Sequence, residues 1–108
     1  MSTSFLGQPP PPEGAHPAGT SHGVLLDTHL AMARPVHPLT PQGCEECLRI
    51  NSTWLHLRLC LTCGHVGCCD SSPMRHARQH AFGVGHPIIR SFEPGESWRW
   101  CYVDQTYV

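Results

Sequence analysis

The sequence predicts a small α+β domain, with a few short strands and one or two helices, over residues 24–108. Three observations lead to this prediction. Cysteine pairs separated by two residues recur and are followed by regularly spaced histidines, one stretch alternates apolar with polar residues, and another carries helix start and stop residues. A chain of 108 residues gains little stability from burial alone and often depends on disulfides or a metal ion.

The composition limits the classes of partner and compartment. The formal net charge is -1, so the chain has no general attraction for nucleic acid or for an anionic membrane. No secretion signal and no apolar run of membrane-spanning length is visible, which favours a cytoplasmic location where thiolates stay available to metal. Residues 1–23 include four consecutive prolines and offer little apolar surface to bury, so they predict a disordered tail.

The strands follow from local patterns. The first apolar cluster, residues 24–30, begins the predicted domain, and the proline-rich residues 34–42 predict a loop. Strict alternation over residues 54–61 predicts a half-buried strand with its leucines on one side. Two further strands are predicted at residues 88–92 and 97–103, joined by a turn that contains a Pro-Gly step.

A helix is predicted between these strands. Ser71 or Ser72 would cap its N-terminus, Pro73 suits its first turn, and Gly83 would end it. The two histidines within it are four residues apart and therefore share one face of the helix.

The cysteines and histidines fit metal sites better than disulfides. The number of cysteines is odd, and a C-x2-C motif presents two sulfurs to one tetrahedral zinc, which also binds imidazole. Eight residues are candidate ligands for two sites: Cys44, Cys47, Cys60, Cys63, Cys68, His76, His80 and His86. A site with four protein ligands has no open position for water, so both would be structural. Spacing alone leaves open whether His76 and His80 bind one ion or two.

These motifs resemble the UBP-type zinc finger, a ubiquitin-binding domain found beside some ubiquitin-specific proteases, in a histone deacetylase and in small stand-alone prokaryotic proteins. The resemblance rests on GCEEC, CLTCGHVGCC, RHARQH, GHP and WCYVDQTYV, and it covers residues 27–108. It implies a twisted antiparallel sheet with two helices. It also implies two ligand sets: Cys44, Cys47, Cys68 and His76 around one zinc, and Cys60, Cys63, His80 and His86 around the other. Cys69 is an alternative to Cys68.

The resemblance implies a candidate third site as well. Many members hold another zinc with an N-terminal C-x-H and a C-terminal C-x2-C motif. This chain has Asp27, His29, Cys101 and Asp104 at the matching positions. Carboxylate oxygen binds zinc, so a mixed site is feasible, but fewer thiolates should make it weaker. The alternative is a pair of solvated aspartates near a buried cysteine.

A peptide site follows from the same resemblance. In ubiquitin-binding members, aromatic side chains and an arginine capture a free C-terminal carboxylate, and Trp100, Tyr102 and Tyr107 stand at the aromatic positions. Stacked aromatic rings suit a glycine-rich peptide, and a cation would fix its carboxylate. A position in the core explains Trp98 and Trp100 equally well.

One departure concerns the arginine. The family's C-G-R-Y reads Cys68-Cys69-Asp70-Ser71 here, and the carboxylate of Asp70 would repel an anion, which argues against the usual mode of ubiquitin binding. Arg58 replaces an expected aromatic residue and could supply the missing cation.

These features favour a non-enzymatic, zinc-stabilised protein-interaction module that recognises a peptide or C-terminal tail. The alternatives are a nucleic-acid-binding zinc finger, which seven basic residues make less favourable, and a thiol redox sensor that uses Cys69 or Cys101. The histidines outside the ligand sets are expected at the surface, except that His65 could orient a ligand.

Overall fold

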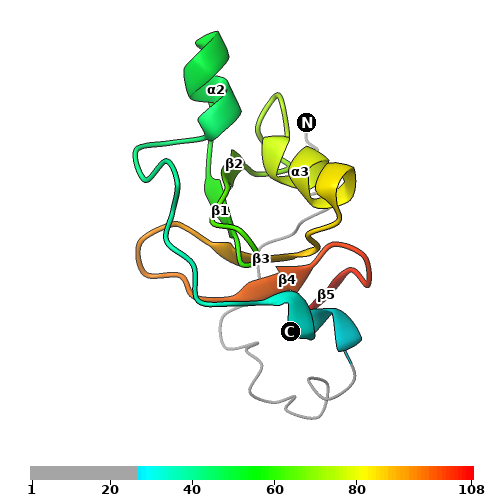
Figure 1. Cartoon of the computed structure of the whole chain (residues 1–108). Helices are drawn as coiled ribbons and strands as arrows, with labels where there is room; N and C mark the ends of the chain where they lie inside the picture. Colours follow the sequence, from blue (N-terminus) through cyan, green and yellow to red (C-terminus); the bar gives the residue numbers. More distant parts are fainter. Residues whose placement is uncertain (1–26) are drawn as a thin grey trace.

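A computed structural model describes residues 27–108, so the predicted tail lies outside the described residues. The prediction of an α+β domain is confirmed: short helices accompany the strands of one sheet (Figure 1). In chain order the elements are a 3-10 helix η3 (Thr28–Met32), α2 (Glu45–Ile50), β1 (Leu57–Cys60), β2 (Val66–Cys68), α3 (His76–Val84), β3 (Ile88–Ser91), β4 (Arg99–Cys101) and β5 (Thr106–Tyr107).

The strands form a five-stranded sheet in the order β2-β1-β3-β4-β5, and every neighbouring pair is antiparallel. In Figure 1, α2 and α3 lie near the β1–β2 end of the sheet, whereas η3 lies beside β4 and β5. The helix α3 packs against β1 and β2, and α2 packs against β2. Both helices therefore cover the part of the sheet from which the second C-x2-C motif emerges.

Each face of the sheet carries its own apolar cluster, and neighbouring residues on β3 and β4 point to opposite faces. The face turned toward α3 holds Ala81, Ile89, Trp98, Trp100 and Tyr102. The other face holds Ile88, Cys101 and Val108, against which pack the partly buried Leu30, Ala33 and Leu61. Trp98 and Trp100 are buried, so the interpretation of both tryptophans as core residues agrees with the structure.

The predicted helix begins later than its serines suggested. It starts at His76, whose backbone N–H donates to Cys68 Sγ over 3.1 Å, and the preceding Arg75 is left-handed at φ 50. The hydroxyl of Ser72 instead accepts a hydrogen bond from the Leu55 backbone. The prediction that Gly83 ends the helix is also wrong, because the chain leaves the helix at the left-handed Gly85.

The strand predicted over residues 54–61 is shorter and more buried than alternation indicated. It spans Leu57–Cys60, and three consecutive residues, Arg58, Leu59 and Cys60, are buried because both faces of the sheet are covered. The strands at 88–92 and 97–103 are likewise reduced to Ile88–Ser91 and Arg99–Cys101. Residues 34–42 form no helix or strand, as predicted.

Two glycines in different surroundings, Gly67 and Gly83, provide a test of this packing. A Cβ atom at Gly67 of β2 would lie 2.7 Å from the backbone nitrogen of Ala77 in α3, whereas a Cβ atom at Gly83 would meet nothing within 4 Å. We expect Gly67→Ala to destabilise the domain by about 1–3 kcal/mol through overpacking. Gly83→Ala should stabilise α3 by about 1 kcal/mol. Urea unfolding at a fixed zinc concentration measures both, and equal effects would contradict the close approach of α3 to β2.

Candidate metal centre

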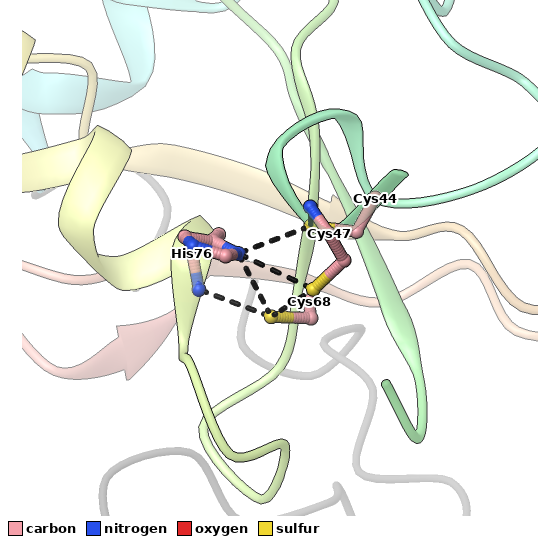
Figure 2. Close-up of side chains that lie close together, drawn as sticks. All are labelled: Cys44, Cys47, Cys68 and His76. Atoms are coloured by element: carbon pink, nitrogen blue, oxygen red, sulfur yellow. Dashed lines mark hydrogen bonds between the residues drawn. The ribbon is translucent and has the colours of Figure 1, made fainter. Parts of the chain in front are cut away.

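The first cluster joins three cysteines and one histidine from separate parts of the chain: Cys44, Cys47, Cys68 and His76. Figure 2 shows the imidazole of His76 directed at the sulfurs. His76 Nδ1 lies 3.3 Å from Cys44 Sγ, 3.4 Å from Cys47 Sγ and 3.6 Å from Cys68 Sγ. The sulfurs of Cys47 and Cys68 are 3.9 Å apart.

Local structure explains how these residues converge. Cys44 and Cys47 lie at the start of α2, where Cys44 Sγ accepts the backbone N–H of Cys47 as a helix cap. Cys68 ends β2, and His76 begins α3. A turn of helix, a strand end and a helix start thus supply the four side chains.

The second cluster contains Cys60, Cys63, His80 and His86. Cys60 Sγ lies 3.7 Å from Cys63 Sγ and 3.7 Å from His86 Nδ1. Cys63 Sγ lies 3.3 Å from His80 Nε2. His76 and His80 share one helix, but the structure brings them into different clusters, one turn apart along α3. The geometry therefore favours one ion for each histidine over a single shared ion.

The distances fit tetrahedral zinc. With Zn–S near 2.3 Å and Zn–N near 2.0–2.1 Å, a regular tetrahedron has S···S edges of about 3.8 Å and S···N edges of about 3.6 Å. The measured S···S separations are 3.7 and 3.9 Å, and the S···N separations run from 3.3 to 3.7 Å. Both clusters can therefore surround one ion each without rearrangement of the backbone.

Electrostatics also favours a bound cation. Burial raises the pKa of Cys44 to about 12 and raises the pKa of Cys60 and of Cys68. Burial, aided by the neighbouring His65 and His86, lowers the pKa of His80 to about 4, so its ring is neutral at pH 7. Neutral imidazole is the form that binds metal, and a divalent cation is what would allow the buried thiols to ionise.

The third group consists of Asp27, His29, Cys101 and Asp104, with candidate ligand atoms within 4.8 Å of one another. His29 Nδ1 lies 2.8 Å from Asp104 Oδ2, and this contact raises the pKa of His29 and lowers that of Asp104. Asp27 Oδ1 accepts the backbone N–H of His29, but Asp27 Oδ2 is buried and has no hydrogen-bond partner within residues 27–108. This orphaned carboxylate oxygen is what a cation at the group would satisfy.

The predicted peptide-binding residues lie together on the α3 face of the sheet. Tyr107 meets the Trp98 ring edge-on at 5.9 Å and the Trp100 ring at 4.9 Å. The guanidinium of Arg58 lies 4.6 Å from the centre of the Trp98 ring. Tyr102 is 1% exposed in the same apolar cluster.

Asp70 has a partner that the sequence did not indicate. Its side chain is 2% exposed and accepts three hydrogen bonds from the guanidinium of Arg78 at 3.0–3.2 Å. Arg78 in turn lies 5.4 Å from the centre of the Tyr102 ring. The negative charge of Asp70 is therefore compensated within the domain, which weakens the repulsion expected for an anionic ligand.

The structure also shows where Cys69 and His65 lie. Cys69 is buried outside all three groups, with its sulfur 3.5 Å from Ser72 Oγ. His65 is buried between the two Cys/His clusters, in contact with Glu46 and His80. Sequence reasoning missed Glu46 because nothing in the spacing of C-E-E-C separates a surface glutamate from one that turns inward.

Comparisons with known proteins agree with this geometry. The family described as a zinc finger in ubiquitin hydrolases and other proteins matches residues 44–108. The solution NMR structure of the protein RPA1320 from Rhodopseudomonas palustris matches with a TM-score of 0.69 and 56% sequence identity, over 75% of this chain and 78% of that chain. Comparison with curated proteins gives no significant match. The resemblance inferred from the sequence motifs is thereby confirmed.

Among the described residues, no helix is both long enough and apolar enough to cross a membrane.

Adjacent cysteines provide a matched test of the first cluster. Cys68→Ser should remove one metal equivalent and unfold α3, because Cys68 Sγ contacts both the imidazole and the backbone N–H of His76. Cys69→Ser should keep the full metal content, since a serine hydroxyl retains the contact with Ser72. Metal content by native mass spectrometry and helicity by circular dichroism measure both outcomes. If only the Cys69 variant lost metal, Cys69 rather than Cys68 would be the ligand.

Proposed function

The chain belongs to the family of UBP-type zinc fingers, and from this premise we propose that it is a non-enzymatic, zinc-binding module that recognises the C-terminal carboxylate of a peptide or protein. In this proposal the Cys/His clusters hold zinc structurally, since each supplies four protein ligands and leaves no position for a reacting water. The aromatic face of the sheet then acts as the recognition surface.

One observation carries the recognition proposal: Arg58 is a buried cation without an acidic partner in the described part of the chain. It is 6% exposed, and its one hydrogen bond runs from Nη1 to the backbone oxygen of Leu57. Its Nε atom is buried without a hydrogen-bond partner. Leaving such a donor unsatisfied costs on the order of 1–3 kcal/mol or more for a charged group. An anionic ligand would remove this cost.

A second unsatisfied donor lies on the same face. Trp100 Nε1 is also buried and has no hydrogen-bond partner among the described residues. Cross-strand pairing places Arg58 opposite Ser91 and Trp100 opposite Ile89, and these positions alternate to one side of the sheet. A carboxylate has two oxygens and accepts hydrogen bonds from a guanidinium and an indole at the same time.

The surroundings suit a peptide chain rather than a free inorganic anion. Trp98, Trp100 and Tyr107 present aromatic surface next to Arg58. Tyr107 is only partly buried, so it is the aromatic side chain that an incoming peptide would reach first. Small residues at the peptide C-terminus fit best, because aromatic rings crowd both donors.

Zinc is the proposed ion in the two Cys/His clusters, for their distances match its tetrahedral geometry. The group of Asp27, His29, Cys101 and Asp104 would bind it more weakly, with one thiolate and with Asp104 exposed. No open coordination position is required at any of the three groups for the proposed role.

The recognition proposal is tested by titrating the zinc-loaded domain with glycylglycine and with glycylglycine amide while following its ¹⁵N–¹H spectrum. The free carboxylate should shift the Trp100 Nε1–H and Arg58 Nε–H resonances, and the amide should shift them at least about tenfold less effectively. Unchanged resonances with the free acid at saturating dipeptide would refute the proposal.

Single-residue variants distinguish the loss of carboxylate binding from the loss of the fold. Arg58→Gln should abolish the carboxylate preference, and Trp100→Phe should weaken it while keeping a large ring in the core. Arg90→Gln is the matched control, since Arg90 belongs to the adjacent strand but points to the opposite face of the sheet. Full truncation of Trp100 is unsuitable, because loss of a buried indole costs about 3–5 kcal/mol of folding free energy.

Stepwise chelation tests the metal assignment. One equivalent should leave first from the exposed Asp104 group with circular dichroism nearly unchanged, and removal of the next two should unfold the domain. Asp104→Asn should eliminate only the weakly held equivalent. Retention of ordered structure after all metal is removed would contradict a structural role for zinc.

A further inference from the structure

His65 occupies the space between the two Cys/His clusters. Its side chain is buried, and its ring lies parallel to that of His80, with centroids 3.9 Å apart and an interplanar angle of 6°. On its other side, His65 Nε2 lies 2.8 and 2.9 Å from the two carboxylate oxygens of Glu46. One imidazole thus touches a member of the second cluster and an acidic residue of α2.

Glu46 is not a member of the first cluster but lies directly beside it. It lies between Cys44 and Cys47, the two ligand candidates of α2, and its carboxylate is 3.8 Å from Cys44 Sγ. A continuous chain of contacts therefore runs from Cys44 through Glu46 and His65 to His80, and on from His80 Nε2 to Cys63 Sγ.

The position of His65 is fixed from several directions. Its backbone oxygen accepts the N–H of Cys60 over 2.8 Å. Its ring fills the space beside Gly67, where an added Cβ would lie 2.8 Å from His65 Cε1. The carboxylate of Glu46 holds the remaining edge. A ring held in this way can determine the orientation of whatever packs against it.

His80 depends on such a neighbour. Imidazole ligands are usually oriented by a hydrogen bond from the nitrogen that does not face the metal. In the described part of the chain, His80 Nδ1 makes no hydrogen bond, and Nε2 faces Cys63. The surface that fixes its plane is the stacked ring of His65.

We propose that Glu46 and His65 are positioning residues that couple the two Cys/His clusters, so that metal bound by the first cluster raises the metal affinity of the second. A bound ion fixes Cys44 and Cys47, and with them the start of α2 that carries Glu46. Glu46 then holds His65, and His65 holds His80 in the plane required for ligation. Because the first cluster has one more thiolate, we expect it to load first at its own affinity, so the coupling appears as tighter binding at the second cluster. Couplings of this kind typically amount to about 5- to 150-fold in affinity.

This inference rests on the proposed metal binding and is tested by titration with Co²⁺, whose visible absorption distinguishes three-thiolate from two-thiolate sites. In the unmodified domain the two-thiolate spectrum should follow closely on the three-thiolate spectrum as Co²⁺ is added. In Glu46→Gln and in His65→Phe, the two-thiolate spectrum should require about 10- to 100-fold more free Co²⁺, with the three-thiolate spectrum much less affected. His65→Phe keeps a flat ring against His80 but cannot bind Glu46, so it removes the link while preserving the packing.

The control is His56→Gln, which alters an exposed histidine that lies 3.8 Å from Glu93 and contacts neither cluster. This variant should bind as much Co²⁺ as the unmodified domain does at each free Co²⁺ concentration. Equal weakening of both sites in the Glu46 and His65 variants would indicate a general loss of stability and would overturn the coupling, as would unchanged loading of both. Failure of the unmodified domain to bind Co²⁺ would instead refute the metal-binding proposal itself.

Discussion

The fold depends on cysteine sulfurs that are buried together where the helices meet the sheet. Cys44, Cys47 and Cys68 are completely buried, and the partly buried Trp54 and Leu57 pack against them. Helices of six and nine residues are unstable on their own in water. Here a sulfur accepts an N–H at the start of each helix: Cys44 Sγ accepts from Cys47 in α2, and Cys68 Sγ accepts from His76, the first residue of α3. The cluster that gathers the sulfurs therefore also stabilises the helix starts.

The sheet divides the chemistry of the molecule between its faces. Cross-strand pairing aligns Cys60 with Ile89, Ile89 with Trp100, and Trp100 with Tyr107 on the side toward α3. That side carries Arg58, two residues before Cys60, and receives His80 from α3. The opposite side receives η3 and holds Cys101 with its aspartates and histidine. The proposed recognition surface and the second cluster thus share one strand, β1.

Much of this could be predicted from the sequence, because ligand spacing is a strong constraint. C-x2-C pairs and helical histidines identified the residues that the structure gathers, and alternation located β1. The start of α3 could not be predicted, since sequence rules favour Ser71 or Ser72 as a cap, whereas Cys68 at the end of β2 accepts the N–H of the first helical residue. The pairing of Asp70 with Arg78 is also tertiary, because it joins a turn to a helix eight residues away.

The burial of Arg58 is another feature that could not be predicted from the sequence. Alternation placed it on the polar side of a half-buried strand, and an arginine there would ordinarily reach solvent. However, β1 is an interior strand, between β2 and β3, and Trp98, the residue just before β4, covers the guanidinium. The burial of this charge follows from the order of the strands in the sheet. That order could not be predicted, because the lengths of the connecting loops do not specify which strands pair.

The short connection between β4 and β5 joins the third group to the aromatic face. Trp100 and Cys101 are consecutive and point to opposite faces, and the chain then turns through Asp104, whose N–H donates to Cys101 Sγ, before reaching Tyr107. A cation held by Cys101 and Asp104 would fix this turn from one side of the sheet, and the turn sets where the Tyr107 ring lies against Trp98 and Trp100 on the other. The replacement of thiolates by aspartates at this group therefore bears on the shape of the recognition surface, because a more weakly held ion restrains the turn less firmly.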